Sequence, residues 1–368
     1  MATNHSAPWA SISASIIPLE PRQMGYQEAI ASPCVSCGTA PCCTHLPLHT
    51  FKITNLLELD HAIYLLNFDR IQLGLSASGE WSVYYTHPCR FLSRQDFTCT
   101  VHNTPAQPQI CVHYNPYNCW YKRVFTQSVS QEFLMIDRER MEFILQHIVL
   151  DENRQIAAVP DWQSMVMAMA DMGSQVNSRT IEPDLQDEAL RQWEDLVLQE
   201  SPTPDPAPPK NYEAMQNPCS GCAAYCCKTL VFPHGFPTTA SNLDYYRFCL
   251  GFPGVELGIT DAGWSVIVKT TCRHLTEDNR CGIYGEASRP LICKYYDALK
   301  CTYRGQFGLP RPDNFLRVRL EQFPWLTECF PFDDQGNIIA MPTSQQAREH
   351  IESRWQEAGR LQVIQPLA

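Results

Sequence analysis

The sequence predicts an α+β fold that consists of two tandem, similar, loop-rich cysteine-cluster domains. The first observation behind this prediction is a repeat, because the stretch PCVSCGTAPCC at 33–43 returns as PCSGCAAYCC at 218–227. The second is that helix-like and strand-like patterns follow both stretches in the same order. The third is the length of 368 residues, of which 44% are hydrophobic, since this suffices to build two separate cores.

The domain boundaries follow from the extent of the repeat. The first copy spans 28–175 and the second spans 212–360. The segment 176–211 between them contains a charged helical pattern at 184–200 and then a proline-rich tract at 201–210. We expect that tract to be an extended, semi-rigid linker, because proline restricts the backbone to extended conformations.

In each copy an amphipathic helix is expected after the cysteine loop. In the first copy it spans 54–68 with Thr54 as the N-cap, and in the second it spans 241–250 with Ser241 as the N-cap. Serine and threonine are favoured at this position because their hydroxyl oxygen accepts one of the unpaired N–H groups of the first helical turn.

A strand and a closing helix complete each copy. A short strand is expected around Trp81 in the first copy and around Trp264 in the second. The closing helix is expected to begin at Asp161 in the first copy and at Thr343 in the second, where Gln346 is placed to form a capping box. Each copy is therefore a mixed unit in which loops carry most of the cysteines.

The overall charge and hydropathy exclude several classes of protein. The net charge is −11, with 28 Lys and Arg against 39 Asp and Glu, which argues against a nucleic-acid binder because phosphate contacts need clustered cations. No apolar run reaches the roughly 18 residues of a membrane span. The N-terminus lacks a basic region ahead of an apolar one, so no secretion signal is expected. We therefore expect a cytoplasmic protein, whose thiols stay reduced.

Cysteine is the most informative residue type in this chain. There are 18 cysteines, and all but Cys249 and Cys329 fall into two equivalent sets of eight. The first set is Cys34, Cys37, Cys42, Cys43, Cys89, Cys99, Cys111 and Cys119, and the second is Cys219, Cys222, Cys226, Cys227, Cys272, Cys281, Cys293 and Cys301. In a reducing compartment such clusters indicate metal ligation or thiol chemistry rather than disulfides.

The spacing of the thiols suggests how they would bind a metal. Two cysteines separated by two residues place both sulfur atoms toward one point, which is half of a tetrahedral site. Neighbouring side chains tend to diverge, so an adjacent pair such as Cys226 and Cys227 would serve two sites or opposite edges of one cluster. Eight thiolates suffice for two four-sulfur sites in each copy, or for one site with the remaining thiols in packing or redox roles. Both partitions stay open.

Zinc and iron–sulfur clusters both accept four thiolates. Each copy is large enough to fold without a metal, so a bound metal is expected to be functional, which favours a 4Fe–4S cluster over structural zinc. Aromatic residues near the cysteines, which would limit solvent access to a cluster, point the same way. These aromatic residues are Phe91, Tyr114, Tyr117, Trp120, Tyr295, Tyr296 and Tyr303.

The second copy resembles a family of cysteine-cluster proteins. The stretch CSGCAAYCC, followed by CRHL and CGIYGEASRPLICKYY, is similar to the family named for its CxxCxxCC motif, which is described as a zinc- or iron-chelating domain. The second copy has Tyr284 and Arg289 where the first has His102 and Gln107. The resemblance implies metal chelation and no single reaction.

One branch of this family resembles flagellin lysine N-methylases, which implies methyl transfer from S-adenosylmethionine to protein lysines. The chain has no GxGxxG loop for such a cofactor, so whether it is an enzyme stays open. Arg289 is the candidate cofactor-binding residue, because a guanidinium can donate to a cluster sulfur or hold a carboxylate. The alternative is that Arg289 pairs with Glu286 and shapes the approach to Cys293.

Three functions are therefore expected in order of preference. The first is metal binding through the two cysteine sets, for electron transfer or for handling of metal or clusters with a protein partner that the sequence does not identify. The second is an S-adenosylmethionine-dependent protein lysine N-methylase-like enzyme. The third is an interaction scaffold stabilised by zinc.

Overall fold

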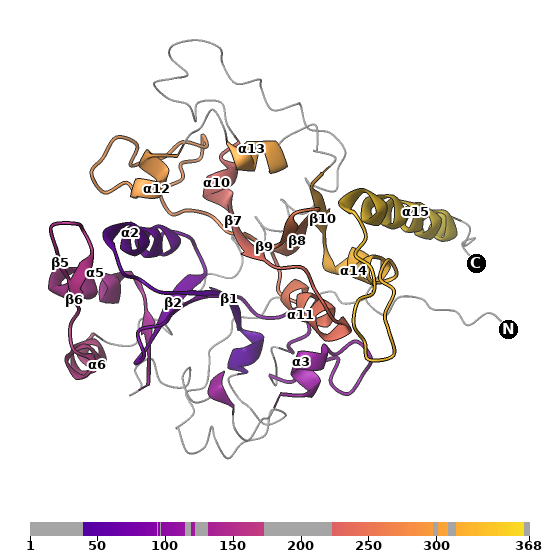
Figure 1. Cartoon of the computed structure of the whole chain (residues 1–368), viewed down its shortest axis with the longest axis horizontal. Helices are drawn as coiled ribbons and strands as arrows, with labels where there is room; N and C mark the ends of the chain where they lie inside the picture. Colours follow the sequence, from indigo (N-terminus) through magenta and orange to yellow (C-terminus); the bar gives the residue numbers. More distant parts are fainter. Residues whose placement is uncertain are drawn as a thin grey trace, which may run out of the picture.

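The computed structural model has an α+β architecture (Figure 1) and describes residues 40–93, 95, 97–114, 119–121, 132–172, 223–296, 301–307 and 314–363. Below, residues 40–172 are referred to as the first half and 223–363 as the second half. The expected helix at 184–200, the linker at 201–210 and four of the predicted ligands lie outside the described residues. These ligands are Cys34, Cys37, Cys219 and Cys222.

The first half contains a four-stranded antiparallel sheet. Its strands are β1 (His45–Phe51), β2 (Ile71–Ser76), β3 (Trp81–Thr86) and β4 (Phe133–Ile136), in the order β1-β3-β2-β4. Every residue of β4 and all but the last residue of β3 are buried, because alternate side chains of these strands pack into two different hydrophobic clusters.

The second half contains a sheet with the same strand order. Its strands are β7 (Thr229–His234), β8 (Val255–Thr260), β9 (Gly263–Lys269) and β10 (Leu316–Val318), in the order β7-β9-β8-β10. The register also corresponds, since Gly74 of β2 pairs with Ser82 and Gly258 of β8 pairs with Ser265. The expected strands around Trp81 and Trp264 are therefore present, as β3 and β9.

Helices lie around the two sheets (Figure 1). The first half has α2 (Leu56–Leu65), α3 (Gln109–Val112), α5 (Arg138–His147) and α6 (Trp162–Asp171), together with the 3-10 turn η2 (Pro41–Cys43) and the hairpin of β5 (Val149–Leu150) and β6 (Ile156–Ala158). The second half has α10 (Tyr225–Lys228), α11 (Ala240–Leu250), α12 (Leu291–Lys294), α13 (Thr302–Phe307), η5 (Leu320–Gln322), α14 (Phe323–Thr327) and α15 (Ser344–Val363). None of the helices in the described part of the chain combines the length and the apolar character needed to cross a membrane.

The start of the helix after the cysteine loop differs from the prediction in both halves. Asn55, not Thr54, caps α2 by accepting the N–H of Glu58, while the N–H and hydroxyl of Thr54 donate to the Glu58 carboxylate. Thr239, not Ser241, caps α11. Each segment has more than one polar residue that can cap, so the choice depends on which residue has an extended backbone.

The closing helices begin where the sequence predicts. The side chain of Asp161 accepts the N–H of Ser164 at the start of α6. At the start of α15, the hydroxyl of Thr343 accepts the N–H of Gln346 at 3.2 Å, and the amide oxygen of Gln346 accepts the N–H of Thr343 at 2.9 Å. This reciprocal pair is the capping box that the sequence predicts.

The two halves share one hydrophobic core. Buried residues from both sheets and from α2 and α11 form a single contiguous cluster. The hydroxyl of Tyr85 in the first half donates to the carbonyl of Pro253 in the second at 2.9 Å, and Phe68 forms an isolated β-bridge with Cys272. The halves therefore stabilise each other through buried apolar surface and through backbone contacts.

The halves also make two reciprocal helix contacts with each other. Asp60 of α2 accepts the N–H of Leu291, the first residue of α12, at 2.6 Å. Asp244 of α11 accepts the N–H of Gln109, the first residue of α3, at 2.5 Å. Figure 1 shows α2 beside α12 and α11 beside α3. Each short helix thus has its first N–H satisfied by a carboxylate of the other half, while its own N-cap residue, Pro108 or Pro290, makes no side-chain capping bond.

Candidate metal centre

Each half opens with the same turn ahead of its adjacent cysteine pair. Ala40 and Ala224 precede the pairs and both have a left-handed backbone, with φ of 37° and 59°. In both turns the second cysteine of the pair donates its N–H to that alanine at 2.9 Å, Cys43 to Ala40 and Cys227 to Ala224. Left-handed alanine is uncommon, so the turn is held by the surrounding structure in both halves.

The pair is tied to the next cysteine by a backbone hydrogen bond. Cys89 donates its N–H to the carbonyl of Cys43 at 2.7 Å, and Cys272 donates to the carbonyl of Cys227 at the same distance. Within each pair the two sulfur atoms lie 3.9 Å apart. Thiols that lie far apart in the sequence are therefore brought together by the same backbone contacts in both halves.

Five thiols of the first half influence one another electrostatically. The pKa of Cys43 is raised well above its ordinary value, first by a hydrogen bond with Cys42, then by burial and by Cys42, Cys89 and Cys111. Burial, with smaller contributions from neighbouring thiols, raises the pKa of Cys89 to about 12 and also raises that of Cys99 and Cys111. These five cysteines are partly buried, and they lie close enough together to raise one another's pKa.

The second half gathers the equivalent thiols. Burial, with smaller contributions from Cys227 and Cys281, raises the pKa of Cys272 to about 11. Burial likewise raises the pKa of Cys293 to about 12, again with contributions from Cys227, Cys272 and Cys281. Cys293 lies on α12, the helix whose first N–H is bound by Asp60 of the first half.

Cys227 differs from its counterpart in the first half. Its pKa is lowered, chiefly by the hydrogen bond with the adjacent thiol of Cys226; burial opposes this, and the positive charges of Arg289 and Lys228 add smaller lowering contributions. In the first half Thr44 follows the cysteine pair and Gln107 precedes the proline before α3, so both equivalent positions are uncharged. Only the second pair has cations beside it at these two positions.

The last cysteine of each set contacts a tyrosine. The thiol of Cys119 donates to the hydroxyl oxygen of Tyr114 at 3.5 Å, and Cys301 accepts from the hydroxyl of Tyr296 at 3.4 Å. These tyrosines are two of the aromatic residues that the sequence singled out near the cysteines.

The two cysteines outside the repeated sets have packing roles. Cys249 lies on α11 and is buried in the core, where burial raises its pKa to about 12. Cys329 packs against the same core, and its thiol donates weakly to the carbonyl of Trp325 at 3.7 Å. Both behave as small apolar residues.

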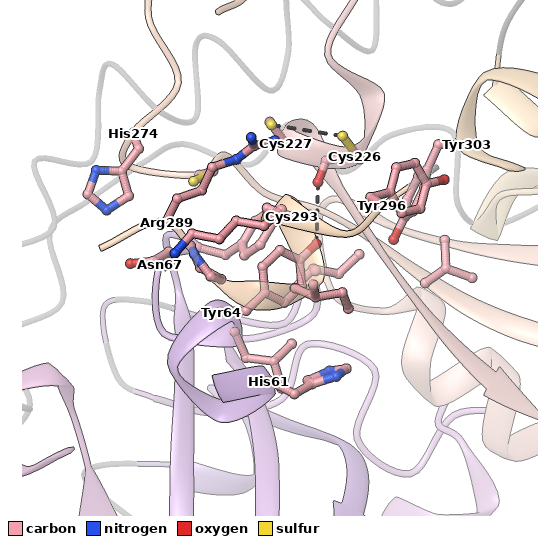
Figure 2. A pocket seen from close by; sticks show the side chains of 18 of the residues that line it. His61, Tyr64, Asn67, Cys226, Cys227, His274, Arg289, Cys293, Tyr296 and Tyr303 are labelled. Atoms are coloured by element: carbon pink, nitrogen blue, oxygen red, sulfur yellow. Dashed lines mark hydrogen bonds between the residues drawn. The ribbon is translucent and has the colours of Figure 1, made fainter. Parts of the chain in front are cut away.

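Arg289 lies beside the second cysteine pair, as Figure 2 shows. Its guanidinium stacks over the ring of Tyr284 at 4.3 Å. Its Nε is buried without a hydrogen-bond partner among the described residues. The alternative pairing with Glu286 is limited to the backbone, where the N–H of Arg289 donates to the carbonyl of Glu286.

A cavity of about 560 Å³ lies between the halves, beside the second set of thiols (Figure 2). Its lining from the second half includes Cys226, Cys227, Cys272, Cys281, Cys293 and Arg289. Its lining from the first half includes His49, Phe51, Leu57, His61, Tyr64 and Phe68. No local pattern in the sequence indicates this cavity, because its walls come from segments that are far apart in the chain.

The second sheet also contains a buried ion cluster that no motif in the sequence indicates. The carboxylate of Glu256 on β8 is bound by Arg317 at 2.7 Å, by Arg319 at 3.0 Å and by Lys269. Burial opposes ionisation, but these three cations outweigh it and lower the pKa of Glu256. The signal in the sequence was weak, since it consists of isolated charges within apolar strands.

The donor set suits metal ions that bind thiolate. Buried thiols that raise one another's pKa resist ionisation, and a bound cation removes that cost by stabilising the thiolate form. Among the described residues, no three cysteine, histidine, aspartate or glutamate side chains are arranged to hold a metal ion. The CxxC cysteines of both sets lie outside the described part of the chain.

Comparison of the chain with family models, with curated proteins and with solved structures finds no match.

Proposed function

We propose that this protein binds metal through the thiolates of its two cysteine sets, as 4Fe–4S clusters in preference to zinc. In this proposal the two halves are copies of one cysteine-cluster unit, and the protein transfers electrons or handles metal or clusters. The proposal rests on one observation. The same left-handed turn and the same 2.7 Å hydrogen bond connect the adjacent cysteine pair to the next cysteine in both halves.

Some of the proposed ligands lie in the part of the chain that the structure describes, and the others lie outside it. In the first half the proposed ligands are Cys43, Cys89, Cys99 and Cys111. The pKa of each is raised by at least one other thiol of the first half. In the second half the equivalent residues are Cys227, Cys272, Cys281 and Cys293. The CxxC cysteines of each set would supply further ligands. A bound iron–sulfur cluster would supply one-electron chemistry, whereas zinc would supply a structural link.

The protein's own residues would prepare the second site for a negatively charged centre. The positive charges of Arg289 and Lys228 stabilise the thiolate of Cys227. The carboxylate of Asp60 holds the start of α12 and so positions Cys293. Half-buried aromatic residues from both halves, such as Tyr64 and Tyr303, lie near these thiols and would limit the access of water to a bound centre.

Elemental analysis of protein purified without oxygen tests the proposal. We expect iron and sulfide in nearly equal amounts, with the visible absorbance of iron bound to thiolate. If the protein contains zinc and no iron, the assignment of the thiolate ligands would stand and a role in electron transfer would be excluded. Protein that contains neither metal and binds neither on reconstitution would refute the proposal.

Two matched substitutions test the ligands. Cys43→Ser and Cys227→Ser should each remove about half of the bound metal, because each disrupts one of the two sets. Cys329→Ala is the control, since Cys329 lies outside both sets, and it should retain the full amount. Full metal content in both serine variants would contradict the ligand assignment.

A further inference from the structure

The cavity between the halves extends well beyond the thiols. The wall formed by Phe51, Leu57 and His61 belongs to the first half and carries no cysteine. Cavities of about 300–1,000 Å³ are typical of small-molecule sites, and 560 Å³ lies within that range. A thiolate-bound metal on the opposite wall would leave this part of the cavity available to a second occupant.

The charged groups that line the cavity favour an anion. Lys52, Arg289 and Lys294 contribute cations, and Glu58 is the one carboxylate among the described lining residues. The Glu58 carboxylate is already engaged, because it accepts the N–H and the hydroxyl of Thr54. Arg289 is the best placed of the cations, since it lies next to the cysteine pair and has no carboxylate partner among the described residues.

We infer that this cavity binds a small organic anion with an apolar body, whose oxyanion group is held by Arg289 beside the thiols of the second half. The guanidinium offers two parallel N–H donors that match a carboxylate or sulfonate. The apolar side chains of Phe51, Leu57 and Phe68 offer a surface for the rest of the molecule. This inference goes beyond the proposed function, because it assigns a ligand that neither cysteine set requires.

The first half lacks the features that make this site. Gln107 replaces Arg289, and its amide oxygen is used locally to accept the N–H of Asn103 at 2.7 Å. Gly251 of the second half packs against Cys89, so closely that a Cβ there would lie 3.3 Å from the sulfur. The residue in the equivalent place beside the second set is Asn67, which lines the cavity. The anion site is therefore specific to the second half.

Fluorescence titration with 1-anilinonaphthalene-8-sulfonate tests the inference, because this dye combines an apolar aromatic body with one oxyanion. The native protein should bind it at one saturable site. Arg289→Gln should weaken binding by about tenfold or more, as expected for loss of one charge-assisted contact. The neutral dye N-phenyl-1-naphthylamine should bind both proteins equally. Arg280→Gln, which alters an exposed arginine outside the cavity, is the control.

A second variant keeps the test decisive if Arg289→Gln does not fold. Leu57 lies at the edge of the cavity with 61% of its surface exposed, so Leu57→Glu should leave the fold intact and repel the anionic dye. Val159→Glu is its matched control, because Val159 is 59% exposed and lies outside the cavity. Native affinity for the anionic dye in both Arg289→Gln and Leu57→Glu would overturn the inference, as would the absence of saturable binding to the native protein.

Metal content measured on the same samples separates this inference from the proposed function. Protein that binds the anionic dye at Arg289 but never binds metal would refute only the proposed function. Protein that retains metal in both cysteine sets but shows no Arg289-dependent dye binding would refute only the anion site.

Discussion

The first and second halves build the same scaffold and surround it with different charges. Both have a left-handed alanine before the cysteine pair and the same strand order. Beside the pair, however, the second half has Lys228 and Arg289, where the first has Thr44 and Gln107. The backbone geometry that brings the thiols together is thus the same whether or not positive charges lie beside the pair to lower a thiol pKa.

The sheets show the same difference. Glu256 is the second residue of β8 and is surrounded by three cations, whereas Gln72 is the second residue of β2. Arg317 lies opposite Gly258 in the ladder, and Met135 lies opposite Gly74. The fold tolerates either a neutral or an ionic interior at these positions, so the ion cluster is a property of the second half and not of the scaffold.

Removing the central carboxylate should have the largest effect on stability. Glu256→Gln leaves three cations around a neutral group, and we expect a loss of about 3–5 kcal/mol, as for breaking a buried ion pair. Urea unfolding measures the change. Glu80→Gln alters an exposed carboxylate and should change stability by less than about 0.5 kcal/mol. An equal loss in the two variants would show that the ion cluster contributes nothing specific.

The deprotonation of Lys269 should make the stability of the protein depend on pH. Burial, followed by Arg317 and Arg319, lowers the pKa of Lys269 to about 8 despite the opposing effect of Glu256. Between that value and the ordinary lysine pKa, the unfolded chain binds more protons, so stability should rise with pH by up to roughly 3 kcal/mol. Lys269→Met should remove this rise in unfolding experiments from pH 7 to 10.5. A rise that persists unchanged in the variant would contradict this assignment.

Removing either of the two reciprocal helix contacts should lower the stability, by modestly different amounts. Asp60→Ala and Asp244→Ala each leave the first N–H of a short helix unpaired, at a cost of about 1–2 kcal/mol. Asp244→Ala should cost more, because Asp244 also forms an ion pair with Arg247. Urea unfolding provides the comparison, with the exposed Asp334→Ala as the control. No loss in either variant would mean that the contacts do not hold the halves together.

The smallest effect concerns the start of α11. Thr239→Ala should destabilise the protein by about 1 kcal/mol, because the Thr239 hydroxyl accepts the N–H of Asn242. Ser241→Ala should leave stability nearly unchanged, since Ser241 lies within the helix and is exposed. Thermal unfolding distinguishes the two, and the reverse order would favour the N-cap expected from the sequence.

Local patterns allowed much of the fold to be predicted. The strands around Trp81 and Trp264 and the helix starts at Asp161 and Thr343 are all present, because each depends on side chains within a few residues. The N-cap predicted at Thr54 was wrong because the neighbouring Asn55 competes for the same role. Where adjacent residues can make the same local bond, the backbone path decides between them.

The sequence by itself determined the α+β composition, the two cysteine sets and Arg289 as a charged residue present beside only the second set, because residue identity and spacing are local properties. Only the tertiary structure decided that Asp60 holds the helix of Cys293, and that a cavity opens beside Arg289 between the halves. These contacts join residues that are distant in the chain. Which of these residues meet depends on how the two halves pack, and no local sequence pattern indicates it.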